Sequence, residues 1–110
     1  MTHQDHRQVY VRELLKAYRS TPGVLGRVRR ADRELAARLY DQQVPLYVIK
    51  TAFLVAAARR CRNNAFATAL PPIRSVHYFL EVFREVLERP PGPRDLAQLK
   101  CFLGTGEPPL

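Results

Sequence analysis

The sequence lacks several features that would assign it to a specialised class of protein. It contains no tryptophan, and its two cysteines, Cys61 and Cys101, lie far apart with no histidine near either of them. This spacing fits neither a zinc site nor a C-x-x-C redox motif. In a reducing cytosol such isolated cysteines are most often small buried hydrophobic residues.

Long apolar runs are absent as well. No stretch of the sequence approaches the roughly 20 apolar residues that a membrane-spanning helix needs. The first residues, MTHQDHRQ, lack the apolar core of a signal peptide. We therefore expect a cytoplasmic protein with no membrane partner.

Lysine is scarce, although the chain is strongly basic. The net charge is +8, yet only three of the 18 basic residues are lysines, Lys16, Lys50 and Lys100. A positive surplus favours polyanionic partners, and arginine pairs bidentately with phosphate. The preference for arginine is equally consistent with GC-rich coding, which leaves the net charge itself unexplained.

Apolar residues recur at helical spacing along most of the chain. With 110 residues, the chain is long enough for a single core. The pattern predicts an all-α, compact bundle of four to five helices in one domain over residues 1–103, followed by a flexible tail over residues 104–110. The predicted helices cover residues 5–19, about 32–41, 46–62, 76–88 and 94–102, with Asp32 and Ser75 as N-caps.

Three of these helices have informative faces. In the first, Arg7, Lys16 and Arg19 lie off the apolar stripe. The third is apolar on most sides, which predicts a central position in the bundle, and its polar strip is formed by Tyr47, Lys50 and Thr51. The fourth has the clearest apolar face, made of Val76, Phe79, Leu80, Phe83, Val86 and Leu87.

The second and third helices are joined by the tight turn Gln42-Gln43-Val44-Pro45. In a helix-turn-helix module, the second helix places its N-terminal residues in the major groove of DNA. Here Lys50 could donate to guanine, Thr51 could touch a base edge and Tyr47 could reach a phosphate. The alternative is an ordinary pair of bundle helices, because many all-helical proteins contain two helices joined by a short turn.

Two arginine clusters bracket this helix pair. The first cluster lies at a helix start, where free N–H groups and the helix dipole favour an anion. It gives the best indication of phosphate binding in the sequence; the alternative is a solvated basic loop. The second cluster is either a further backbone contact or a set of cations that stabilises a helix C-terminus. The first comprises Arg27, Arg29, Arg30 and Arg33, and the second comprises Arg59, Arg60 and Arg62.

The sequence predicts no catalytic set. No spacing of acidic residues pairs two carboxylates on a buried face. There is no glycine-rich phosphate loop and no serine or cysteine nucleophile signature. We therefore expect a protein that is not an enzyme and that needs no cofactor or metal.

Three segments resemble patterns in small bacterial helix-turn-helix proteins of mobile elements and replication modules. They read D-x-x-L-A-x-x-L-Y, V-P-L-x-x-I and P-I-R-S-x-x-Y-F. The matching positions are Asp32, Leu35, Ala36, Leu39, Tyr40, Val44, Pro45, Leu46, Ile49 and Pro72–Phe79. The chain differs from the usual pattern in having no glycine in the turn. The resemblance implies DNA binding and indicates no target.

Three functions are consistent with these observations. The first is a helix-turn-helix DNA-binding protein whose arginine clusters contact the phosphate backbone, with DNA favoured over RNA. The alternative is a small basic subunit of a larger nucleoprotein complex, of the CRISPR effector small-subunit or reverse-transcriptase accessory type. Such a subunit holds RNA or single-stranded DNA without reading its sequence. The third is a protein-interaction module for an acidic partner, and the sequence leaves the oligomeric state open.

Overall fold

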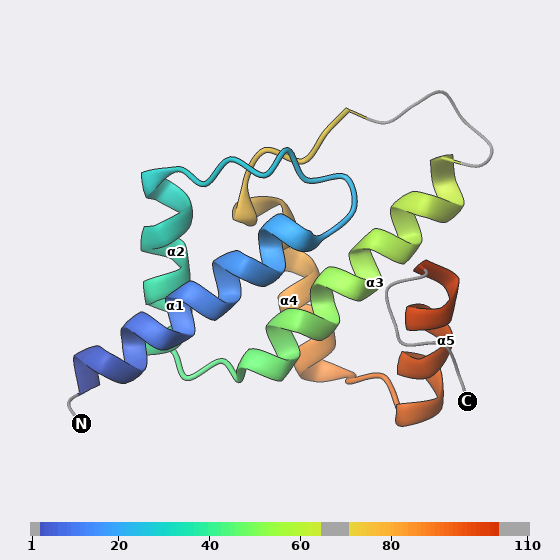
Figure 1. Cartoon of the computed structure of the whole chain (residues 1–110). Coiled ribbons are helices and arrows are strands. Elements are labelled where there is room, and N and C mark those ends of the chain that lie inside the picture. Colours follow the sequence, from blue (N-terminus) through green and yellow to red (C-terminus); the bar gives the residue numbers. More distant parts are fainter. Residues whose placement is uncertain (1–2, 65–70, 104–110) are drawn as a thin grey trace.

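Five α-helices and one short 3₁₀ helix make up the part of the chain that the computed structural model describes (Figure 1). That part is residues 3–64 and 71–103, with side chains described for residues 5–60 and 71–98. The predicted all-α bundle is confirmed, whereas the predicted tail over residues 104–110 lies outside the described residues. The helices are α1 (His3–Ser20), α2 (Arg30–Asp41), α3 (Leu46–Asn64), α4 (Leu80–Glu88) and α5 (Pro93–Leu103), with the 3₁₀ helix η1 (Val76–Phe79) leading into α4.

Helix α3 lies at the centre of the bundle, as its apolar sequence predicts. Helices α1, α4 and α5 pack against α3, and α2 packs against α1. Neighbouring aromatic rings in the core have centroids 4.8 to 6.3 Å apart, within the range of favourable aromatic pairs. These rings join α1, α3, η1 and α4, and they belong to Tyr18, Phe53, Phe79 and Phe83.

The buried face of the fourth predicted helix differs from the prediction. Leu80 and Leu87, predicted to be buried, are 41% and 47% exposed. The element begins with a 3₁₀ turn, in which residues three apart lie directly over one another. Within α4, Phe83 and Val86 define the buried side, and at 3.6 residues per turn Leu80 and Leu87 lie roughly a quarter turn away from it. The buried residues are Val76, Phe79, Phe83 and Val86.

The carboxylate of Asp32 joins two helix starts. The prediction that Asp32 is the N-cap of α2 is wrong, because the helix begins at Arg30 and Asp32 lies within its first turn. Asp32 is 1% exposed. Its carboxylate accepts hydrogen bonds from the N–H of Arg29 at 2.9 Å, the N–H of Val76 at 2.9 Å and the hydroxyl of Ser75 at 3.2 Å. Because the first N–H groups of a helix have no partner within it, one carboxylate serves the starts of both α2 and η1.

Ser75 is the N-cap of η1, as predicted. Its hydroxyl accepts a hydrogen bond from the N–H of His77 at 3.1 Å and lies 3.0 Å from Nδ1 of the same histidine. Nearby, Val24 and Ile73 form an isolated parallel β-bridge, and the N–H of Leu25 donates to the carbonyl of Ile73 at 3.1 Å. The linker before α2 (residues 21–29) and the segment before η1 (residues 71–75) are therefore fixed side by side.

The turn between α2 and α3 closes without glycine. Gln43 has a φ of 62°, in the left-handed region. Its N–H donates to the carbonyl of Tyr40 at 2.9 Å, and the N–H of Val44 donates to the carbonyl of Leu39 at 3.1 Å. These two hydrogen bonds form a Schellman motif, in which the left-handed residue is usually glycine. The predicted pair of helices joined by a tight turn is confirmed, and Gln43 is the strained residue in that turn.

Replacing Gln43 by glycine should stabilise the protein. We expect Gln43→Gly to raise the free energy of unfolding by about 1 kcal/mol, because glycine adopts the left-handed conformation without strain. Chemical denaturation measures the change. Gln42→Gly is the matched control, because Gln42 has a φ of −81° and should lose stability on this substitution. Equal effects at the two positions would contradict strain at Gln43.

Removing the Asp32 carboxylate should be strongly destabilising. We expect Asp32→Ala to lower the free energy of unfolding by about 3 kcal/mol, because buried N–H groups lose their acceptor. Glu34→Ala is the control, since Glu34 pairs with Arg30 at the surface and its loss should cost less than about 1 kcal/mol. Thermal melting of both variants tests the difference, and losses of equal size would show that Asp32 does not join the helix starts.

Two buried tyrosines differ in whether the hydroxyl has a partner. The hydroxyl of Tyr10 donates to the carbonyl of Val44 at 2.8 Å. Tyr18 is fully buried, and its hydroxyl has no hydrogen-bond partner within the described part of the chain. Burial raises the pKa of Tyr18, and the charge of Asp32 raises it further. Burial raises the pKa of Tyr10 to about 12.

Removing the two hydroxyls should therefore have opposite effects. Tyr10→Phe should lower the free energy of unfolding by about 1 kcal/mol, whereas Tyr18→Phe should raise it by about 1 kcal/mol. Chemical denaturation at neutral pH measures both. Because its pKa is raised on folding, Tyr10 contributes stability that is lost as the pH rises from 10.0 to about 12, and Tyr10→Phe should reduce that loss. Destabilisation by Tyr18→Phe would show that its hydroxyl has a partner.

Candidate anion-binding groove

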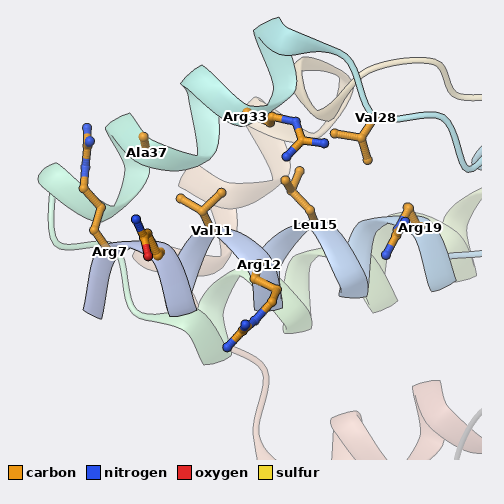
Figure 2. A pocket seen from close by; sticks show the side chains of 9 residues that line it. Arg7, Val11, Arg12, Leu15, Arg19, Val28, Arg33 and Ala37 are labelled. Carbon is orange, nitrogen blue, oxygen red and sulfur yellow. The ribbon is translucent and has the colours of Figure 1, made fainter. Parts of the chain in front are cut away.

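A groove with a volume of about 560 Å³ lies between α1 and α2 (Figure 2). One side is formed by residues that share a face of α1, and the other side is formed by α2 and the linker before it. The lining residues are Arg7, Gln8, Val11, Arg12, Leu15 and Arg19 from α1, Val28 from the linker, and Arg33 and Ala37 from α2.

The groove has an apolar floor and a cationic rim. Figure 2 shows Val11 and Leu15 pointing from α1 toward α2, where they belong to the stripe that packs α1 onto the core. Because these residues hold the two helices together, their outer surface forms the bottom of the groove. The floor comprises Val11, Leu15, Val28 and Ala37, and the rim comprises Arg7, Arg12, Arg19 and Arg33.

The charge of the rim is only partly neutralised. Arg7 donates two hydrogen bonds, of 3.1 and 2.8 Å, to the carboxylate of Asp41. Arg12, Arg19 and Arg33 form no ion pair with any described side chain. No acidic residue is found among the described residues that line the groove. Like charges that share a groove repel one another, so a bound anion would relieve an unfavourable interaction.

The first predicted arginine cluster lies at and beside this groove. All four of its members are exposed, and Arg33 belongs to the rim. Arg30 pairs with Glu34 at 3.1 Å, but its side chain is 93% exposed, so water screens this pair strongly. Arg27 and Arg29 flank the floor residue Val28 in the linker. The linker therefore carries further exposed cations next to a residue that lines the groove.

The second predicted cluster is largely engaged within the protein. Arg59 donates two hydrogen bonds of 2.8 Å to the carboxylate of Glu85 on α4. These hydrogen bonds raise the pKa of Arg59 and lower the pKa of Glu85. Arg59 is thus paired with a carboxylate at the surface of the bundle, whereas the side chain of Arg62 lies outside the described residues.

Arg60, the middle member of that cluster, is held against two other segments. It donates to the carbonyl of Pro71 at 2.8 Å, and its guanidinium lies 5.7 Å from the centroid of the Tyr78 ring. A Cβ atom on Gly23 would lie 2.9 Å from its Nε, so the glycine, with a φ of 94°, leaves the space that Arg60 occupies. Arg60 is therefore poorly placed to contact a ligand.

The predicted base-reading residues line a second hollow, of about 950 Å³, between α1 and α3. Tyr47 is 66% exposed and Lys50 is exposed, in agreement with the predicted polar strip. Thr51, the third residue of the strip, is only 8% exposed, although it also lines the hollow. The packing of α3 against α1 covers this side of the helix, and a sequence pattern within one helix does not reveal it.

Arg7, Arg12 and Arg19 are not among the binding residues that the sequence predicts. Their spacing could have indicated part of the site, because Arg12 and Arg19 are seven residues apart and so share one face of a helix. Their proximity to Arg33 depends on how α1 packs on α2. That packing is a tertiary contact, which no local pattern of the sequence shows.

Other kinds of site find little support within the described part of the chain. No cluster of three or more His, Cys, Asp or Glu residues there could hold a metal ion, and the side chains of Cys61 and Cys101 lie outside it. No helix there is long and apolar enough to cross a membrane.

Comparisons with protein-family models, curated proteins and solved structures give no match to this chain. The groove is therefore interpreted from its own residues and charge.

Proposed function

We propose that this protein binds nucleic acid through the sugar–phosphate backbone, along the groove between α1 and α2 and the linker before α2. The observation that carries this proposal is the cationic rim. Arg12, Arg19 and Arg33 surround an open groove and have no carboxylate partner among the described side chains. Guanidinium groups bind phosphate oxygens through two parallel hydrogen bonds, which makes arginine well suited to this contact.

The spacing of the rim favours a polymer over a single small anion. Arg12 and Arg19 are seven residues apart, which separates their Cα atoms by about 10 Å along the axis of α1. Figure 2 shows the guanidinium groups of Arg12, Arg19 and Arg33 pointing in different directions and not toward one point. A nucleic-acid strand carries one negative charge per nucleotide, so several phosphates can contact separate arginines.

A helix-turn-helix that reads bases is the second candidate function. It is favoured by the exposure of Tyr47 and Lys50 at the start of α3 and by the resemblance of the sequence to helix-turn-helix proteins. In this arrangement Lys50 would donate to guanine and Tyr47 would contact phosphate. The burial of Thr51 argues against one of the three proposed contacts. Binding of the sugar–phosphate backbone at the groove involves more exposed cations than base reading by Lys50 does. It also suits a subunit of a nucleoprotein complex.

Neutralising the rim should weaken nucleic-acid binding and reduce its dependence on salt. For the triple variant Arg12→Gln, Arg19→Gln and Arg33→Gln, we expect the slope of log affinity against log salt to fall by about 2 to 3 units. Each arginine that contacts a phosphate displaces counterions, so its removal lowers the slope. Fluorescence anisotropy with labelled duplex DNA, single-stranded DNA and RNA, between about 50 and 200 mM salt, measures the effect.

The matched control removes the same charge elsewhere. Arg84, Arg89 and Arg94 are exposed and do not line the groove, so their triple glutamine variant should retain most of the slope. Equal weakening by the two triple variants would show that net charge, and not the groove, causes binding. The absence of binding at low salt would refute the proposed function. Loss of sequence discrimination in Lys50→Ala, with the rim intact, would favour base reading.

A further inference from the structure

We infer that the groove holds a single strand, of either DNA or RNA, in preference to a duplex. The inference rests on the proposed function and adds the form of the nucleic acid. It comes from the combination of an apolar floor with arginines from both helices. The charge of the rim alone would suit any polyanion, so the apolar floor is what distinguishes a single strand from a duplex.

The floor is the feature that a duplex would leave unused. Val11, Val28 and Ala37 are half-buried in the free protein, so part of their carbon surface faces water. In a duplex the phosphates lie outermost and the bases are stacked inside, so a duplex would place charged groups over this surface. Apolar surface gains free energy only when it is covered by other apolar surface.

A single strand offers the matching surfaces. Its unpaired bases can turn their faces toward the floor while its phosphates lie along the rim. Arg12 and Arg19 lie on the α1 side and Arg33 on the α2 side (Figure 2). Arg33 reaches toward the gap between the helices, whereas Arg12 extends from α1 on the side away from α2 (Figure 2), so a strand that lies across α1 and the floor can contact arginines of both helices. The planar guanidinium groups can also stack on bases, which lysine cannot do.

The charge of the groove also fits an acidic segment of another protein. Two observations favour a nucleic acid. All the charged residues that line the groove are arginines, the residue that matches phosphate geometry most closely. Arg27 and Arg29 add exposed cations in the linker on either side of Val28, which suits a polymer that carries many charges.

The test makes the floor polar without changing its shape or charge. The double variant Val11→Thr and Val28→Thr should bind oligodeoxythymidylate and oligouridylate about fivefold more weakly, because the floor no longer offers the same apolar surface. Its affinity for a duplex of the same length should stay unchanged. Val9→Thr is the control, because Val9 is 42% exposed on α1 and does not line the groove.

The outcomes separate this inference from the proposed function. If the duplex binds as tightly as the single strands and the floor variant has no effect, the single-strand inference is overturned, while weakening by the rim variant would still support the proposed function. If poly-L-glutamate binds at the rim and no nucleic acid does, both are overturned. Thermal melting checks that the floor variant is folded, and Ala37→Ser serves as a second floor variant that leaves both valines in place.

Discussion

The buried carboxylate of Asp32 is the contact on which the arrangement of the helices most depends. It accepts hydrogen bonds from Ser75 and Val76, which lie 43 and 44 residues away in the sequence. Because a buried charge without hydrogen bonds is very unfavourable, the starts of α2 and η1 have to lie together. The position of α2 follows from this contact, and Arg33, the next residue, is thereby brought to the groove.

Internal pairing decides which arginines remain available to a ligand. The two arginines at the end of α3 that the structure describes are engaged, Arg59 by a carboxylate and Arg60 by a carbonyl and an aromatic ring. Around the groove, Arg12 and Arg19 have no such partner among the described side chains. The net charge of +8 therefore indicates a basic protein, whereas the pairing of individual side chains indicates where an anion can bind.

The sequence predicts much of the fold and less of the candidate site. Apolar periodicity predicts the five helices, and the N-cap role of Ser75 follows from local chemistry, because these features depend on residues close in the chain. The exposure of Leu80 depends on which side of α4 packs against the rest of the bundle, and the burial of Thr51 depends on the packing of α3 against α1. The groove combines side chains of two helices and a linker, so the sequence predicts one of its arginines, Arg33, and misses the other three.

The contact between Gly23 and Arg60 couples backbone shape to surface electrostatics. The guanidinium of Arg60 occupies space that exists only because residue 23 has no side chain. Any larger residue at this position would push the guanidinium away from the carbonyl of Pro71 and from the ring of Tyr78. A neutral substitution in the linker would thus redistribute the electric field of the molecule without adding or removing a single ionisable group.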